Sequence, residues 1–322
     1  MIYEKLAWLG MDFIPAAITY ILSFTALFIG SITDLRTREV PDWVNYGLII
    51  SGLGINALFT SILPNQILVK EVVYNNGLFY QYIISPESYI IKSILGLILL
   101  FGIAYIMFYA GQWGGGDSKI LMGLGAMIGI DAGSISSQFL SGFFINALFI
   151  GAVYGLFWSI LLVFKNRQKF WKEFSKMLLQ KNAVRAKKMM LLFLVLLLIF
   201  LFAAKLNYIK ILILSLAFIV LATFYLWIFV KAIEKSAMYK LVEPTKLTEG
   251  DWIVKEIYVK GKYITGPKDL GISKSQIKKL IEFYKKRKIR KILIKEGIPF
   301  VPSFFIAFIV TLVLGNPLMW LI

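Results

Sequence analysis

The chain of 322 residues contains neither cysteine nor histidine. It can therefore form no disulfide, no thiol nucleophile, no serine–histidine dyad and no metal site built from thiolate or imidazole ligands. Any acid–base chemistry depends on Asp, Glu, Lys or Tyr. Charged residues are also scarce, because Asp, Glu, Lys and Arg together make up only 16% of the chain.

Apolar residues are abundant instead, at 59% of the chain with a mean hydropathy of +0.76. Apolar residues make up about 45–50% of soluble domains, so the composition predicts an all-α polytopic membrane protein. A membrane span needs about 20 apolar residues. Eight spans are predicted, of which the fourth is short and is bounded by Ser118 and Asp131: Phe13 to Ile32, Trp43 to Ile62, Ser93 to Ala110, Ile120 to Ile130, Phe139 to Phe164, Met189 to Ala204, Ile211 to Val230 and Ser303 to Ile322.

The formal net charge of +17 comes mainly from two blocks that flank apolar spans. Lys165 to Lys188 contains nine basic residues and one acid, and Lys231 to Pro302 contains eighteen basic and eight acidic residues. Basic loops of this kind lie on the cytoplasmic side, beside anionic lipid headgroups. We therefore expect both termini outside, membrane lipids as partners of the basic blocks, and no nucleic acid.

This pattern divides the chain into five expected parts. A transmembrane core (1–164, helices 1–5) is followed by a basic amphipathic segment (165–188), two more spans (189–230), a small soluble cytoplasmic domain (231–302) and a final span (303–322). In the soluble part, Trp252 to Val259, Lys262 to Ile264 and Arg290 to Ile294 are predicted strands, and Ser273 to Lys288 is a predicted helix with Ser273 as its N-cap. This part is an α+β insertion before the last helix.

One glycine-rich stretch carries an acid where none is expected. Gly114-Gly115-Gly116-Asp117-Ser118-Lys119 separates the uncharged runs Ser93 to Ala110 and Ile120 to Ile130. An ionised aspartate near hydrocarbon costs about 2–3 kcal/mol on insertion scales, so such acids indicate function. Glycines permit positive φ and close backbone approach. The alternatives are a plain loop, Asp117 as a helix N-cap, or Lys119 as an interfacial residue.

A second acidic stretch, Thr33 to Asp42, follows the first apolar run. Asp34 is placed at a predicted helix end, as Asp117 is at a predicted helix start. Asp42 is the rival to Asp34, but it follows Pro41 and so has the position of an N-cap for the second span.

Together, Asp34-x-Arg36 with Val40-Pro41-Asp42, and Gly114-x-Gly116-Asp117-x-Lys119, resemble the active-site signature of the type IV prepilin peptidases. These are membrane aspartyl proteases of the Gly-x-Gly-Asp class. Leu247 to Ile253 and Lys295 to Pro302 look like the carboxyl-terminal region of the archaeal preflagellin and prepilin peptidases. The cysteine-rich segment usual in bacterial members, which also methylate the new N-terminus, is missing from this chain, so we expect proteolysis without methyl transfer.

The resemblance implies that Asp34 and Asp117 are catalytic. Two carboxylates within a few ångströms hold one proton between them, so one activates water as a base while the other donates as an acid. Neither a metal nor another cofactor is expected. The implied substrate is a pilin-like or archaellin precursor with a basic leader and an apolar helix, cut at the cytoplasmic membrane face. Supporting or substrate-binding roles are expected for Gly114, Gly116, Lys119, Arg36 and Asp42.

Two other interpretations compete with this one. A protease of the presenilin and signal-peptide-peptidase type shares Gly-x-Gly-Asp but pairs it with Tyr-Asp and Pro-Ala-Leu motifs, which do not appear here. A proton-coupled secondary transporter would place acids near mid-membrane in an inverted repeat, whereas these acids lie at span ends.

Overall fold

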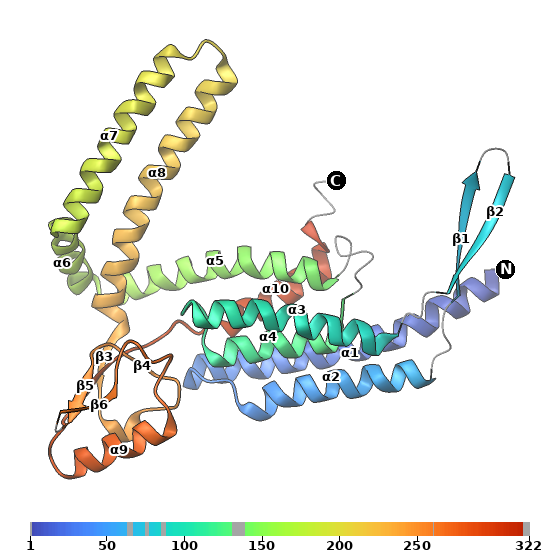
Figure 1. Ribbon diagram of the computed structural model, residues 1–322, viewed down its shortest axis with the longest axis horizontal. Coiled ribbons are helices and arrows are strands. Elements are labelled where there is room, and N and C mark those ends of the chain that lie inside the picture. Colours follow the sequence, from blue (N-terminus) through green and yellow to red (C-terminus); the bar gives the residue numbers. More distant parts are fainter. Residues whose placement is uncertain are drawn as a thin grey trace. The chain divides into compact units, whose positions relative to one another are not determined.

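The computed structural model describes residues 2–62, 67–74, 77–84, 88–130, 139–259 and 261–317 (Figure 1). It divides into two compact units. The bundle unit comprises Met1–Gly155 and Gly297–Ile322, and the insertion unit comprises Leu156–Glu296.

Six helices in the described residues are long and apolar enough to cross a membrane: Ile14–Thr37, Asp42–Ile62, Tyr89–Tyr109, Phe139–Lys165, Lys181–Ala203 and Asn207–Met238. The prediction of an all-α polytopic membrane protein with a small strand-containing insertion is confirmed. The count of eight stays a prediction, because the remaining two candidates, Gly115–Ile128 and Val301–Leu314, have only 14 residues each.

The bundle unit contains α1 (Ile2–Thr37), α2 (Asp42–Ile62), α3 (Tyr89–Tyr109), α4 (Gly115–Ile128), the first part of α5 (Phe139–Lys165) and α10 (Val301–Leu314). A short apolar helix can be accommodated when its neighbours surround it, and eight residues of α4 are buried. Helices α2 and α3 both pack against α4, and α1 packs against α4 and α10. The core of the unit is therefore built around α4.

Small residues bring α3 and α4 together. A Cβ added to Gly125 would lie 2.8 Å from the carbonyl carbon of Gly96, so only glycine permits this approach. The carboxyl end of α4 is held by polar side chains from its neighbours. Asn56 Nδ2 donates to the carbonyls of Ala126 (3.3 Å) and Met127 (3.1 Å), and Ser93 Oγ donates to Ala126. These bonds fix α4 and the acid that it carries.

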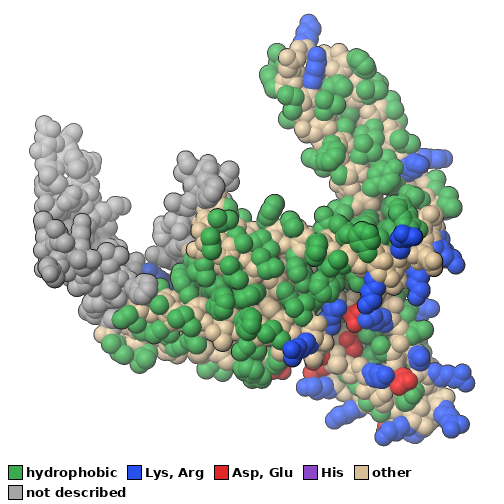
Figure 2. Space-filling view, turned by 180° about the vertical axis from the view of Figure 1, so that it is seen from behind, with side chains coloured by type: hydrophobic (Ala, Val, Ile, Leu, Met, Phe, Trp, Pro, Cys, Tyr) green, Lys and Arg blue, Asp and Glu red, His purple; other side chains and the backbone are tan. Residues whose placement is uncertain are grey.

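Large aliphatic and aromatic side chains remain exposed on the outside of the bundle unit, among them Ile50, Phe149 and Val313, each at least 70% exposed. Figure 2 shows hydrophobic side chains covering this outer surface. Exposed apolar area on this scale is what a lipid-facing surface requires.

The loop after α2 forms the antiparallel hairpin β1 (Ile67–Tyr74) and β2 (Gly77–Ile84), with Tyr74 opposite Gly77. A hairpin in this loop is what the Asn75-Asn76-Gly77 stretch predicts, although residues 75 and 76 lie outside the described residues. Residues 131–138, between the fourth and fifth predicted spans, and the end of the last predicted span, 318–322, also lie outside them.

In the insertion unit, the rest of α5 is followed by α6 (Arg167–Leu178), α7 (Lys181–Ala203) and α8 (Asn207–Ile233). Helices α7 and α8 form an antiparallel hairpin (Figure 1). The segment Lys165 to Lys188 is not one helix: α6 ends at Leu178, and the basic residues from Lys181 onward form the first turns of α7. Helix α6 buries Phe170 and Met177 and exposes its basic side chains.

A π-helical turn (Glu234–Met238) leads from α8 into the α+β part. Its three-stranded antiparallel sheet has the order β3 (Tyr239–Val242), β7 (Ile292–Lys295), β4 (Trp252–Ile253), and β5 (Ile257–Val259) pairs with β6 (Lys262–Thr265). The predicted strand Trp252 to Val259 is interrupted at residues 254–256. Figure 2 shows Lys and Arg gathered over this part of the insertion unit.

Helix α9 (Lys274–Lys285) covers the small apolar core of this part, with Leu280 fully buried. Ser273 is its N-cap, as predicted. Ser273 Oγ accepts from the Gln276 N–H at 3.3 Å, and Gln276 Oε1 accepts from the Ser273 N–H at 2.8 Å, so the two side chains form a capping box.

Candidate active site

Asp34 lies in the last turn of α1 and is only 6% exposed. A buried carboxylate needs hydrogen-bond donors. The donor here comes from a distant part of the chain, because the backbone N–H of Val301 bonds to Asp34 Oδ2 at 3.0 Å. Val301 is the first residue of α10, so the free N–H groups of that helix start face the acid.

Asp117 lies in the first turn of α4, where it is half-buried. Its Oδ2 accepts a hydrogen bond from the Gly114 N–H at 2.9 Å. Gly114 is the N-cap of α4, and Asp117 occupies the third helical position, so the alternative of Asp117 as N-cap is wrong. The helix begins at Gly115 rather than at Ser118.

The glycines near Asp117 act through packing rather than through unusual dihedral angles. None of Gly114, Gly115 and Gly116 has a positive φ. The glycine before them, Gly111, does (φ 67°). A Cβ on Gly116 would lie 3.3 Å from Val40 Cγ2, and a Cβ on Gly114 would lie 3.2 Å from Asp117 Oδ2. Gly116 therefore lets α4 approach the chain between α1 and α2.

Two elements distant in sequence are packed against the Asp34 end of α1. A Cβ on Gly30, one turn before Asp34, would lie 2.9 Å from Ile120 Cδ1 of α4 and 3.3 Å from Val301 Cγ1 of α10. Ile120 in turn follows Asp117 by one helical turn. The two acids thus lie at the same end of the packed helices, close enough for their charges to interact.

Lys119 points toward α2. Its Nζ pairs with Asp42 Oδ1 at 2.7 Å and lies 4.9 Å from the ring centroid of Tyr46. Asp42 is exposed in the first turn of α2, and Arg36 is exposed in the last turn of α1. Among the five supporting residues, Gly114 and Gly116 surround Asp117, whereas Lys119 and Asp42 form a separate ion pair.

Sequence reasoning missed three groups beside Asp34. Besides Val301, Arg38 adopts a left-handed conformation (φ 62°) just after α1, and its Nη1 donates to the Gly297 carbonyl at 3.4 Å. Tyr154 on α5 interacts electrostatically with Asp34 and Arg38. The sequence contains a signal only for Val301, because Pro302 at the start of an apolar run marks a helix N-terminus with unsatisfied N–H groups.

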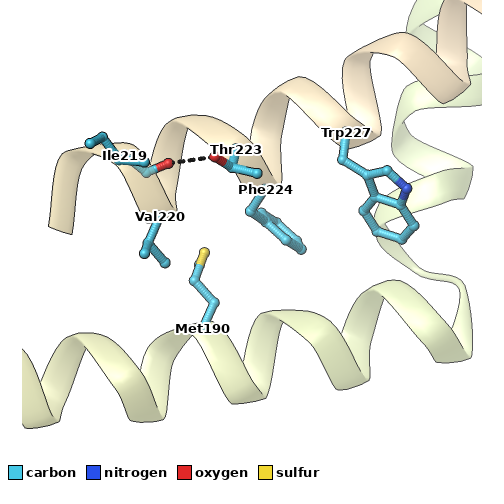
Figure 3. A pocket seen from close by; sticks show the side chains of 6 residues that line it. All are labelled: Met190, Ile219, Val220, Thr223, Phe224 and Trp227. Atoms are coloured by element: carbon cyan, nitrogen blue, oxygen red, sulfur yellow. Dashed lines mark hydrogen bonds between the residues drawn. The ribbon is translucent and has the colours of Figure 1, made fainter. Parts of the chain in front are cut away.

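A cavity of about 360 Å³ lies elsewhere, between α7 and α8 of the insertion unit (Figure 3). The hydroxyl of one lining side chain, Thr223, donates to the Ile219 carbonyl at 2.7 Å. The other lining residues are Met190, Ile219, Val220, Phe224 and Trp227. With no titratable group in its lining, this cavity offers no acid–base chemistry.

Within the described part of the chain, no group of three or more Asp and Glu side chains is placed to hold a metal ion. What the site does offer is two carboxylates from different helices, each bonded to the backbone N–H of a residue at a helix start. Such a pair can share a proton and can polarise a water molecule between a base and an acid.

Fold and site together define a polytopic membrane protein that carries a pair of buried or half-buried aspartates at one end of its bundle unit. Residues 21–156 match the model of the type IV leader peptidase family. A preflagellin peptidase from Methanococcus voltae is 30% identical over 186 residues, which cover 53% of this chain and 70% of that protein. The chain belongs to the type IV leader peptidase family, and the resemblance stated from its motifs is confirmed.

Two other preflagellin peptidases match over 111 residues, about a third of this chain. That from Methanocaldococcus jannaschii is 35% identical and that from Methanococcus maripaludis is 32% identical. The matches span 38% and 39% of those two proteins. No solved structure matches the chain.

Proposed function

We propose that this protein is a membrane aspartyl endopeptidase that removes the short basic leader of preflagellin or pilin-like precursors. The observation that carries the proposal is the meeting of Asp34 and Asp117 at one end of the bundle unit, each bonded to a backbone N–H. Family membership and the similarity to three preflagellin peptidases support the substrate class.

In the proposed reaction, the ionised carboxylate takes a proton from a bound water molecule, which attacks the scissile carbonyl. The protonated partner donates its proton to the carbonyl oxygen, and protons then reach the leaving amine. This route forms no covalent intermediate on the protein and uses no metal or cofactor. Methyl transfer is not part of it.

We place both aspartates at the cytoplasmic membrane face, because that orientation puts the basic segments inside. A precursor would then keep its basic leader in the cytoplasm and its apolar helix in the bilayer, with the bond between them beside the acids. The exposed basic residues of α6 and of the first turns of α7 would contact anionic lipid headgroups. Arg36 at the exposed end of α1, together with the Lys119–Asp42 pair, would border the path of the leader.

Asp34→Asn and Asp117→Asn test the proposal most simply. Each variant is expected to lower leader cleavage by roughly 10²-fold or more, because one acid–base partner is lost, while the protein still inserts into membranes. Asp251→Asn is the matched control. This residue is a half-buried aspartate of the insertion unit whose carboxylate accepts the Thr248 N–H at 2.8 Å, and its variant should cleave normally.

The assay is cleavage of a panel of preflagellin and prepilin precursors in membranes. Normal cleavage by either Asn variant would remove that residue from the mechanism. A wild-type protein that cleaves no leader but moves protons or solute across vesicles would favour the transporter interpretation instead.

A further inference from the structure

A buried tryptophan lies directly before the backbone donor of Asp117. The Gly114 N–H bonds to Asp117 Oδ2, and the preceding residue, Trp113, is only 6% exposed although it belongs to the short connection between α3 and α4. Such connections run over the surface, and the neighbouring Gln112 is indeed exposed. The burial of the Trp113 side chain therefore shows that this connection is packed against another element.

That element is the start of α10. The centroid of the Trp113 ring lies 6.3 Å from that of Phe300 and 5.4 Å from that of Phe304, the second pair in an edge-to-face arrangement. Aromatic rings at these distances attract one another beyond the area that they bury. Phe300 is the N-cap of α10, and the next residue, Val301, donates its N–H to Asp34 Oδ2. The ring contact thus joins the residues that precede the two backbone donors.

The partners of Trp113 are themselves held in place. The rings of Phe300 and Phe304 lie 5.3 Å apart, and that of Phe304 lies 6.4 Å from Phe143 of α5. A Cβ on Gly151 would lie 2.6 Å from Phe300 Cζ, so the Phe300 ring rests directly on the α5 backbone. The Phe300 side chain has no room to retreat from Trp113 toward α5.

The two acids stand on different helices, and each is bonded to a donor outside its own helical hydrogen-bond pattern. A shift of one donor against the other would turn the carboxylate that it holds. Pairing of two carboxylates over one proton depends on a spacing of a few ångströms. A contact that fixes the two donors relative to each other therefore bears directly on the pair.

Building on the proposed function, we propose that Trp113 is a positioning residue for the aspartate pair. By packing on Phe300 and Phe304, its ring fixes the connection before α4 against the start of α10. The Gly114 N–H and the Val301 N–H are thereby held at a constant spacing, and so are the two carboxylates that they bind. The tryptophan forms no bond to the substrate.

Trp113→Leu tests this role, because it removes the ring and keeps an apolar side chain. Displacement of a reacting group by about 1 Å costs on the order of 10²-fold in rate, so kcat for precursor cleavage should fall about tenfold or more. KM should stay within about twofold, because Trp113 does not contact substrate. Trp113→Phe, which keeps an aromatic ring, should recover much of the lost rate.

A matched pair of variants separates positioning from general packing. Phe300→Leu and Phe308→Leu make the same chemical change about two turns apart. Phe308 is fully buried on α10, but its ring packs on Phe139 and Phe143 of α5 rather than on Trp113. Both variants should unfold at a lower temperature than wild type, because both lose buried contacts. Only Phe300→Leu should also lower kcat.

The width of the pH profile reports the spacing itself. Two carboxylates that share a proton titrate in two steps, which draw together when the groups move apart. The bell-shaped profile of kcat/KM should therefore narrow in Trp113→Leu, with the acid limb at higher pH and the alkaline limb at lower pH. The other charged or titratable groups near the pair, which are Arg38 after α1, Tyr154 on α5 and the Lys119–Asp42 ion pair, are the same in the variant.

Two outcomes would overturn the proposal. Wild-type kcat in Trp113→Leu would show that the ring does not position the pair. A lower kcat with a profile of wild-type width, or an equal loss of kcat in Phe308→Leu, would reduce the role of Trp113 to packing.

Infrared titration of the purified protein without substrate provides a second arm. The carboxyl bands of the pair are identified by subtraction of the spectrum of the double variant Asp34→Asn with Asp117→Asn. Their two titration steps should lie closer together in Trp113→Leu than in wild type or in Phe308→Leu. If wild-type protein cleaves no precursor, the proposed function fails, yet this arm still tests Trp113. Unchanged steps in Trp113→Leu would overturn the role of the tryptophan even in an active enzyme.

Discussion

The close contact between α3 and α4 positions Asp117, and Gly96→Ala perturbs that contact without touching either acid. The added methyl carbon would lie 2.9 Å from Gly129 Cα and would also meet the Gly125 carbonyl oxygen. Carbon atoms rest about 3.5 Å apart or more, so the two backbones must separate by about 0.6 Å. Both neighbours are backbone atoms, so no side chain can move aside.

Overpacking of this kind costs about 1–3 kcal/mol of stability. Because displacement of a reacting group by about 1 Å costs on the order of 10²-fold in rate, leader cleavage should fall about tenfold or more. Gly102→Ala is the matched control, since Gly102 lies on the same helix and an added Cβ there meets no atom within 4 Å.

The assays are the initial rate of precursor cleavage in liposomes and thermal unfolding in detergent. Gly96→Ala should be slower and less stable than wild type, and Gly102→Ala should match wild type in both. If Gly96→Ala cleaves and unfolds like wild type, α4 is not held by this contact and the reasoning is refuted.

Three further predictions address other parts of the molecule. Arg38→Gly should raise the free energy of unfolding by about 1 kcal/mol, because glycine adopts φ 62° without strain. The cleavage rate should fall, because the cation beside Asp34 is lost. A variant in which stability and cleavage rate fall together would contradict this. Ser273→Ala should lower the stability of α9 by about 1 kcal/mol through loss of its N-cap, measured by hydrogen exchange of the α9 amides, and unchanged exchange would count against the capping box. A chelator should leave cleavage by the proposed carboxylate pair unchanged, and inhibition by EDTA that zinc reverses would argue against that pair.

Local features of this fold follow from the sequence. Uncharged runs predict the helices, and the charged residues between them place Asp34 in the last turn of α1 and Asp117 in the first turn of α4. The sequence also predicts the capping of α9, because Ser273 stands three residues before Gln276 at the start of an amphipathic run. These features depend on neighbours within a few positions.

The partners of Asp34 could not be predicted in the same way. Val301 is 267 residues away along the chain, and apolar periodicity does not tell which helices lie side by side in a bundle. Tyr154 is likewise one of several tyrosines in apolar runs, with no local pattern to mark it. Three adjacent glycines suggested positive φ, yet none of them has it, and Gly116 instead packs tightly against Val40.

The meeting of Asp34 and Asp117 is the central claim, and the absence of cysteine from the chain makes it directly measurable. The double variant Asp34→Cys with Asp117→Cys carries only two thiols. In membranes, an oxidant or a short bifunctional maleimide should join them, and a water-soluble thiol reagent should label both from the cytoplasmic side. Thiols that resist cross-linking, or that are labelled from opposite sides of the membrane, would contradict the account.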